Sequence, residues 1–142
     1  YTDGRYFVWS ATESWEYSSG AWLNSTNQGS TLASFGFLPS LTAIESDGTT
    51  TLNRDTNGLI YAENTGITYG GSQITVSQFA GFTAVAAEDF GTNGGKKLVF
   101  AHSSGNYFVW SLDASWRFSS GSWVFASDMA GITQLFTDFD LS

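Results

Sequence analysis

Short runs of aromatic and β-branched residues alternate with polar turn residues along the chain, a pattern typical of antiparallel strands joined by hairpins. Six such runs follow one another through the middle of the sequence. They span residues 41–46, 49–53, 58–63, 74–78, 82–89 and 96–102. Glycine pairs such as Gly70-Gly71 supply the positive φ angles that tight hairpin turns need. We therefore expect a mainly β fold built around an antiparallel meander.

A segment near the start of the sequence recurs 101 residues later. Residues 6–22 and 107–123 are identical at eleven of seventeen positions, including a shared Tyr-Phe-Val-Trp-Ser run. In each copy aromatic and β-branched residues flank a short turn, which predicts a Trp-rich hairpin. An even-numbered loop at residues 112–115 would divide the second hairpin into two faces. One face would hold Tyr107, Val109, Trp116 and Phe118, and the other Phe108, Trp110 and Leu112.

A helical segment is expected after each hairpin, over residues 23–38 and 124–139. In the second copy Ser127 can cap the helix, and apolar residues recur behind it at helical spacing. The predicted fold is thus an antiparallel meander with two hairpin-helix units, one at each end. Residues 1–39 form the first unit, residues 40–142 form the meander with the second unit, and together they are expected to make one compact domain.

The charge balance narrows the possible partners. The chain has 142 residues, of which five are basic and thirteen acidic, and its net charge of -8 argues against nucleic acid and anionic membranes as partners. Cysteine is absent, so disulfides and thiolate metal sites are excluded, and the single His102 excludes a multi-histidine site. The acidic composition with few lysines predicts an extracellular or cell-surface protein, and the start at Tyr1 without Met or an apolar leader is consistent with a processed secreted protein or an excised domain.

Several motifs occur together in a recognisable order. They are Ile44-Glu45, Gly48, Thr50-Thr51-Leu52, Asp55, Gly58, Tyr61, Ala86-Ala87-Glu88, Trp110-Ser111-Leu112-Asp113 and Ser115-Trp116. Over residues 41–120 the chain resembles the tryptophan-rich C-terminal domain first noted in cyanobacterial proteins. The resemblance implies part of a large secreted or surface protein, often with tandem units and neighbouring calcium-binding repeats, and no common catalytic site. It also implies that the first hairpin ends a preceding unit. Residues 35–40 stand where the family often has an acidic loop, which does not favour calcium between units.

One loop resembles a calcium motif. Asn53, Asp55 and Asn57 place oxygen-bearing side chains at alternating positions, and Gly58 occupies the sixth position. The twelfth position is Asn64 instead of the bidentate Glu of a calcium loop, so a plain β-hairpin turn is the competing interpretation. No other cofactor is expected.

Enzymatic chemistry finds no support in the spacing of the acidic residues. Glu13 and Glu16 are replaced in the second copy, and Glu88 and Asp89 are adjacent on a predicted strand, so they point to opposite faces. His102 stands at a predicted strand end without a nucleophile motif nearby. We expect a non-catalytic protein.

All six tryptophans lie in the two hairpins. They are Trp9, Trp15 and Trp22 in the first and Trp110, Trp116 and Trp123 in the second. Such residues can serve inter-unit packing or, alternatively, can stack on sugar rings. The sequence therefore predicts a structural or assembly module of a bacterial surface or filament-forming protein, whose partners are other copies of itself or neighbouring domains. The alternative is a carbohydrate-binding or adhesion module that contacts polysaccharide through exposed Trp and Tyr.

Overall fold

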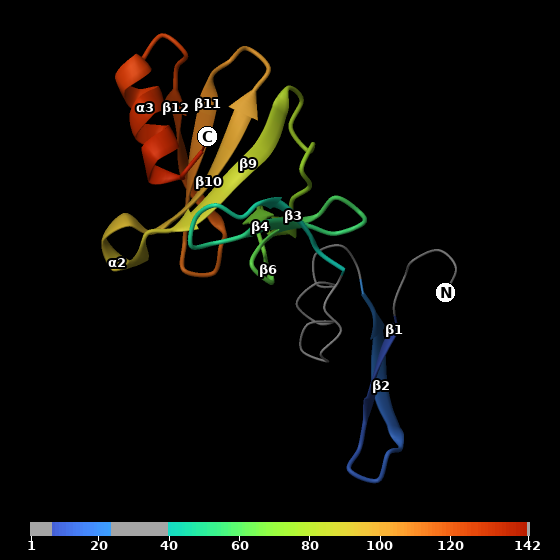
Figure 1. The fold of residues 1–142 in the computed structure, drawn as a ribbon. Helices are drawn as coiled ribbons and strands as arrows, with labels where there is room; N and C mark the ends of the chain where they lie inside the picture. Colours follow the sequence, from blue (N-terminus) through green and yellow to red (C-terminus); the bar gives the residue numbers. More distant parts are fainter. Residues whose placement is uncertain (1–6, 24–39, 142) are drawn as a thin grey trace.

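The strands form four small antiparallel sheets within residues 7–23 and 40–141, the part of the chain that the computed structural model describes (Figure 1). One two-stranded sheet, the first hairpin, contains β1 (Phe7–Ala11) and β2 (Tyr17–Trp22). The long-stranded sheet has the order β12 (Phe118–Val124), β11 (Tyr107–Leu112), β10 (Lys96–His102) and β9 (Phe82–Asp89). We call β11 with β12 the second hairpin.

The other two sheets are built from shorter strands. The short-stranded sheet has the order β3 (Thr42–Glu45), β4 (Leu52–Arg54), β5 (Ile60–Ala62) and β6 (Thr65–Gly66). A separate small hairpin joins β7 (Thr68–Tyr69) to β8 (Ser72–Gln73) through Gly70 and Gly71, which have φ angles of 58° and 85°. These positive angles are those of a two-residue hairpin loop, which explains the glycine pair.

Two helices belong to the described chain. α2 (Gly91–Gly94) is a single turn between β9 and β10, and α3 (Met129–Asp138) follows β12. α3 lies within the predicted helical segment, but its N-cap is Asp128 instead of Ser127, because the Asp128 carboxylate accepts a hydrogen bond from the Gly131 N–H at 2.9 Å. The helix expected over residues 23–38 lies outside the described residues.

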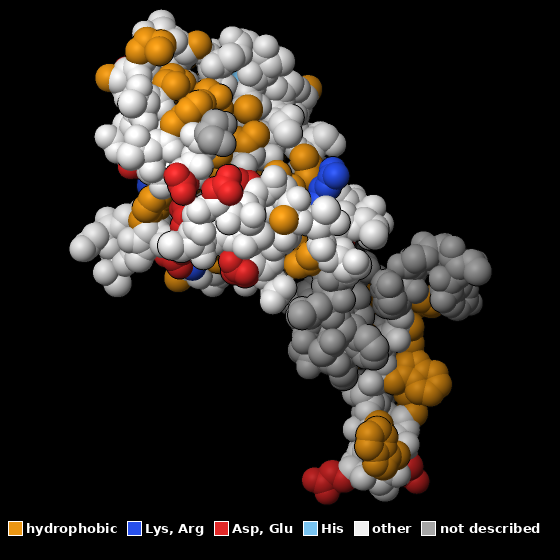
Figure 2. All heavy atoms as spheres, viewed as in Figure 1, with side chains coloured by type: hydrophobic (Ala, Val, Ile, Leu, Met, Phe, Trp, Pro, Cys, Tyr) orange, Lys and Arg blue, Asp and Glu red, His pale blue; other side chains and the backbone are white. Residues whose placement is uncertain are grey.

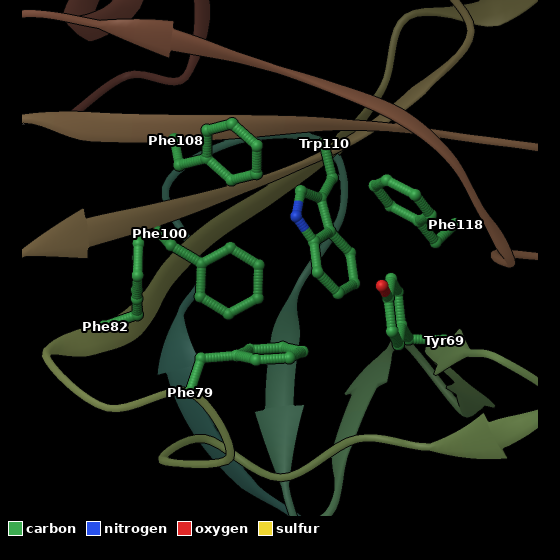
Figure 3. A pocket seen from close by; sticks show the side chains of 7 residues that line it. All are labelled: Tyr69, Phe79, Phe82, Phe100, Phe108, Trp110 and Phe118. Atoms are coloured by element: carbon green, nitrogen blue, oxygen red, sulfur yellow. The ribbon is translucent and has the colours of Figure 1, made fainter.

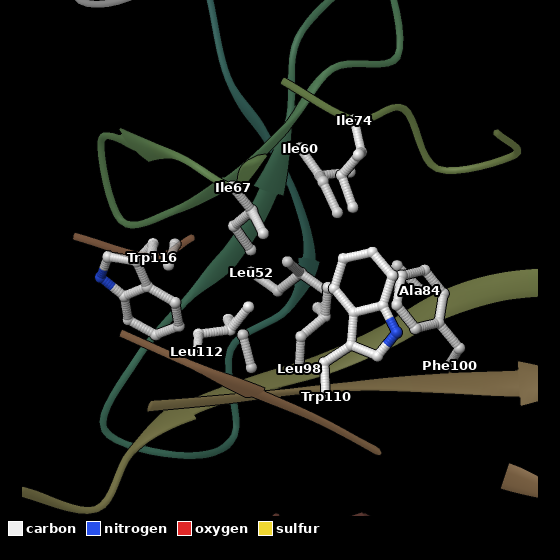
Figure 4. Packing of buried hydrophobic residues seen from close by; sticks show 12 residues of the cluster. Leu52, Ile60, Ile67, Ile74, Ala84, Leu98, Phe100, Trp110, Leu112 and Trp116 are labelled. Carbon is white, nitrogen blue, oxygen red and sulfur yellow. The ribbon is translucent and has the colours of Figure 1, made fainter. Parts of the chain in front are cut away.

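The long-stranded sheet has an apolar core on each face. On one face Val99 and Ala86 meet Leu135 of α3 and Phe139, its C-cap, and α3 lies against this side of the sheet (Figure 1). On the other face the main core packs side chains of this sheet against the short-stranded sheet and the loops beside it (Figure 4). The main core contains Leu52, Ile60, Ala62, Ile67, Ile74, Ala84, Ala87, Leu98, Phe100, Trp110, Leu112 and Trp116.

A buried carboxylate ties the two four-stranded sheets together. Glu88, on β9, accepts hydrogen bonds from the Thr49 N–H at 2.6 Å, the Thr49 hydroxyl at 2.7 Å and the Thr50 N–H at 3.2 Å. The Thr50 hydroxyl in turn accepts from the Asp89 N–H at 3.1 Å. A carboxylate with several donors tolerates burial that an unpaired one does not. Glu88 therefore fixes the loop before β4 to the edge of the long-stranded sheet.

The structure confirms a mainly β, antiparallel fold but not the predicted arrangement of two hairpin-helix units. The strands divide into four small sheets instead of one meander, and the second hairpin belongs to a larger sheet. The strand predicted at residues 74–78 is wrong: only Thr75 makes an isolated bridge, and residues 76–78 turn. The division at residue 39 stays a prediction. Within the described ranges, neither helix has the length and apolar character needed to cross a bilayer.

Candidate functional site

The two Trp-rich hairpins have the same turn. In the second, the Asp113 N–H donates to the Arg117 carbonyl at 2.9 Å and the Trp116 N–H donates to the Asp113 carbonyl at 3.0 Å. In the first, Thr12, Glu16 and Trp15 make the corresponding bonds at 2.8 and 2.9 Å. Trp15 and Trp116 both adopt positive φ, 64° and 60°, which is uncommon for a bulky residue. The turn thus projects a tryptophan at the tip of each hairpin.

A β-bulge follows each turn at the same place. Ser111 pairs with Ser120 while Leu112 pairs with Phe118, so Ser119 is an extra residue on β12. Ser18 is the equivalent extra residue on β2, and its hydroxyl donates to the Ser10 carbonyl at 3.1 Å. This bulge makes the predicted faces wrong in part, since an inserted residue reverses the parity between strands. Trp116 and Phe118 join Trp110 and Leu112 in the main core, away from Tyr107 and Val109.

The packing inside each hairpin is also repeated. A Cβ atom built on Gly20 would lie 2.5 Å from the Phe7 ring, and one built on Gly121 would lie 2.7 Å from the Phe108 ring. The Phe7 and Trp22 ring centres are 5.0 Å apart, as are those of Phe108 and Trp123. Each phenyl ring therefore lies across a glycine, which explains why both hairpins carry Gly at this position.

Two of the three tryptophans of the second hairpin are buried by the residues around it. Trp110 is 4% exposed and Trp116 is 6% exposed. Figure 4 shows both indoles with Leu112 in the main core. The Lys96 ammonium group lies 4.5 Å from the centre of the Trp116 ring, and the Thr68 N–H donates to the Trp116 carbonyl at 3.1 Å. Trp116 is thus contacted by Lys96 of β10 through its ring and by Thr68 of β7 through its carbonyl.

The first hairpin leaves the equivalent side chains in solvent. Trp9 is 69% exposed and Trp15 is 90% exposed, and Tyr17 beside them is exposed as well. Figure 2 shows hydrophobic side chains along this hairpin and acidic ones at its tip, where Glu13 and Glu16 lie. Trp22 and Trp123 do not share this contrast, since they are 47% and 43% exposed. Exposure therefore distinguishes Trp9 and Trp15 of the first hairpin from their equivalents Trp110 and Trp116 in the second.

An aromatic pocket of about 270 Å³ opens beside the second hairpin (Figure 3). It is lined by Tyr69, Phe79, Phe82, Phe100, Phe108, Trp110 and Phe118. The Tyr69 and Trp110 rings are stacked with centres 5.4 Å apart, and Phe79 meets Trp110 edge to face at 5.6 Å. The lining side chains carry only a phenol and an indole N–H as polar groups. The pocket can hold an apolar or aromatic group but offers no acid, base or nucleophile.

Two side chains of the calcium-like motif make hydrogen bonds to the backbone. One Asp55 carboxylate oxygen accepts from the Asn57 and Leu59 N–H groups, each at 2.9 Å, in the loop between β4 and β5. Asn53 lies on β4, where its side-chain amide donates to the Glu63 carbonyl at 3.0 Å. Among the described residues, no group of three His, Cys, Asp or Glu side chains is placed to hold a metal. The loop geometry is that of a hairpin turn closed by an aspartate.

The carboxylates near the second hairpin make hydrogen bonds within the fold, and three pKa values are shifted. Asp89 is exposed whereas Glu88 is buried, as expected for adjacent strand positions. A hydrogen bond from Lys96 lowers the pKa of the Asp89 carboxyl, and the Arg117 backbone N–H lowers the pKa of Asp113. Burial raises the pKa of the Tyr61 hydroxyl. Asp113 also accepts from the Arg117 Nε at 2.7 Å, which closes the turn of the second hairpin.

Sequence reasoning missed three residues that build the surroundings of the second hairpin. Tyr69 and Phe79 line the pocket, and Lys96 lies over Trp116. Tyr69 stands directly before the Gly70-Gly71 pair, which marks a hairpin and could have placed it on a short strand. Nothing in the sequence indicates that Phe79 or Lys96 contacts a tryptophan, since these contacts join segments that are far apart in the chain.

Comparison with known proteins gives one family match. Residues 47–141 match the family model of the tryptophan-rich Synechocystis species C-terminal domain. Comparison with curated proteins and with solved structures finds no match. The matched range covers more than half of the chain and includes β4 to β6 of the short-stranded sheet, the long-stranded sheet with the second hairpin, and α3, while β3 lies outside it. The chain belongs to the family of the tryptophan-rich Synechocystis species C-terminal domain.

Proposed function

We propose that the chain is a non-catalytic assembly module of a bacterial surface or filament-forming protein, and that it associates through its Trp-rich hairpins. One observation carries this proposal: Trp9 and Trp15 are 69% and 90% exposed, whereas Trp110 and Trp116, at equivalent places, are 4% and 6% exposed. The hairpin sequence that buries its tryptophans at residues 107–123 therefore presents an apolar face to solvent at residues 7–22. Exposed apolar patches of this kind mark interaction sites.

The proposal includes an extracellular or cell-surface location, in keeping with the acidic composition and few lysines, and excludes nucleic acid and anionic membranes as partners. Five basic and thirteen acidic residues give a net charge of -8, and such a surface repels anionic lipid and nucleic acid. The acidic groups Glu13 and Glu16 at the tip of the first hairpin keep this apolar surface bordered by charge. We propose no metal or cofactor. The alternative is a calcium ion bound at the loop motif of Asn53, Asp55 and Asn57.

Sedimentation velocity of the full chain over a range of concentrations tests the assembly proposal. We expect the average mass to rise with concentration, and a Trp9→Ser, Trp15→Ser variant to stay monomeric. Met129→Ser is the matched control, because Met129 is an exposed apolar residue on α3, away from the first hairpin. A full chain that stays monomeric throughout, or a control that loses association equally, contradicts the proposal.

Carbohydrate binding is the second candidate, favoured by one observation. Trp9 and Tyr17 form an exposed edge-to-face pair with ring centres 5.8 Å apart, and exposed aromatic faces stack on sugar rings. Binding to a polysaccharide array, with quenching of tryptophan fluorescence that Trp9→Ser removes, would support this candidate. A broad array without binding contradicts it.

A further inference from the structure

The outward edge of β1, the one that does not face β2, has no strand partner among the described residues. β1 pairs with β2 alone, whereas its equivalent β11 pairs with β12 on one edge and with β10 on the other. The second hairpin therefore shows in atomic detail what covers a hairpin of this sequence. It supplies the occupant, the register and the contacts that the first hairpin lacks.

We infer that β1 is completed by a strand of the β10 type from a neighbouring unit of the same fold in the same polypeptide. The inference deepens the proposed assembly function and rests on it. β10 pairs Lys97 with Ser111, Leu98 with Trp110 and Val99 with Val109. Moved back by the 101-residue offset, the same pairs join the neighbouring unit's Lys97, Leu98 and Val99 type residues to Ser10, Trp9 and Val8.

The contacts around each tryptophan follow from this register. Trp110 lies 4.9 Å from Phe100 and 5.6 Å from Phe79 between ring centres, so Trp9 would enter an aromatic cluster of the same kind. Trp116 lies under Lys96 and accepts from Thr68, so Trp15 would receive an ammonium group and a backbone donor. These contacts bury the two indoles that the first hairpin exposes.

The occupant is a neighbouring unit in the polypeptide because β10 of this chain is already paired on both edges. A second, identical copy could accept β1 only by releasing its own second hairpin. That exchange would expose Trp110 and Trp116 while it buried Trp9 and Trp15, so it gains no apolar burial, and identical copies associate by contact between their exposed first hairpins and not by strand exchange. A neighbouring unit whose β10 strand has no partner on the edge where β11 pairs in this chain carries no such cost.

An extended chain tests the inference. Residues 41–106 are added in place of residues 1–5, so that the added Asn106 precedes Tyr6 as the original Asn106 precedes Tyr107. Because the chain has no cysteine, Lys97→Cys in the added segment with Ser10→Cys reports the register directly. Direct partners across antiparallel strands have Cα atoms within disulfide range. Lys96→Cys with Ser10→Cys is the control, since a shift of one residue points to the opposite face.

We expect the Lys97→Cys, Ser10→Cys pair to form an intrachain disulfide much faster than the control pair. Acrylamide quenching of tryptophan fluorescence should also fall several-fold per indole relative to the original chain. Equal rates for the two pairs overturn the inference. A disulfide that forms between chains overturns the assignment to the same polypeptide. Sedimentation of the original chain tests the assembly proposal by a different measurement, so failure of that proposal can be told apart from failure of the strand pairing.

A second variant answers the question if the extended chain does not fold. The first hairpin is written into the position of the second, with Leu112 kept because it fills the core. The changes are Asp113→Thr, Ala114→Glu, Arg117→Glu, Phe118→Tyr, Ser122→Ala and Val124→Leu. We expect cooperative unfolding to persist, and to be lost when Trp110→Ser is added. A grafted chain without a cooperative transition overturns the inference, because the first hairpin then cannot pair with β10.

Discussion

The ammonium group of Lys96 lies 4.5 Å from the centre of the Trp116 ring while it also pairs with the Asp89 carboxylate. Trp116 sits at the hairpin tip and Lys96 and Asp89 sit on neighbouring strands, so one cation joins the turn to the edge of the long-stranded sheet. Cation–π contacts are stronger when water is excluded, and only 18% of the Lys96 side chain is exposed.

Removal of this charge should weaken the fold modestly. Lys96→Met keeps the length of the side chain but removes the cation, and we expect a loss of about 1 kcal/mol in the free energy of unfolding. Urea denaturation followed by circular dichroism measures it. Lys97→Met is the matched control, because Lys97 donates to Ser111 at 3.2 Å and contacts no indole among the interactions described above. Equal losses in both variants would show that the contacts of Lys96 with Trp116 and Asp89 add nothing beyond the contact that Lys97 makes.

The two hairpin tips should respond very differently to the same substitution. Trp116→Ala should lower the free energy of unfolding by about 3–5 kcal/mol, because it empties a buried site. Trp15→Ala should change it by less than about 0.5 kcal/mol, since the indole is in solvent. Both residues have φ near 60°, so backbone strain cancels in the comparison. Similar losses at both positions, measured by urea denaturation of monomeric protein, would contradict the assigned environments.

Gly48 should tolerate no side chain while Glu88 is present. A Cβ atom on Gly48 would lie 1.5 Å from the Glu88 Oε1 atom, so the carboxylate must move away from the Thr49 and Thr50 donors. We expect Gly48→Ala to cost at least about 2 kcal/mol. In a Glu88→Asp background, whose carboxylate is shorter, the cost should fall. A double-mutant cycle without coupling would rule out this clash.

Acid should loosen the turn of the second hairpin through Asp113. Its folded pKa is lowered by the Arg117 N–H, so its contribution is fully present above the unfolded pKa of about 3.9 and is lost as the pH falls through the lower folded value. Asp113→Asn should therefore flatten the dependence of stability on pH below about 4. Asp89→Asn serves as comparison, because the pKa of Asp89 is lowered by Lys96 instead. An unchanged pH profile for Asp113→Asn would contradict this role.

The long strands could be predicted from sequence because each carries a sustained apolar and aromatic run. β9 and β10 begin and end at the predicted residues 82–89 and 96–102. The two-residue strands at Thr65, Thr68 and Ser72 could not, because two residues show no periodicity. Ile74 misled the prediction: it is fully buried, yet the Thr75 N–H donates to the Gln78 side chain at 3.2 Å and the chain turns.

The candidate site was predictable only in part. The 101-residue offset correctly equated the hairpins, since their turns, bulges and ring pairs coincide. The parity of Trp116 and Phe118 was wrong, because a bulge at Ser119 leaves no trace in the apolar pattern. The contrast between Trp15 and Trp116 depends on which strands lie next to each hairpin, and that is a property of the whole fold.

The bulges at Ser18 and Ser119 make the two edges of each hairpin different. Both extra residues belong to the outer strand, β2 or β12, and a bulge bends and twists its strand so that a further straight strand fits poorly along it. The inner strands β1 and β11 run opposite these bulges without an inserted residue. If the proposed array forms, it is therefore directional: its two ends differ, and each sheet ends at the strand that carries the bulge.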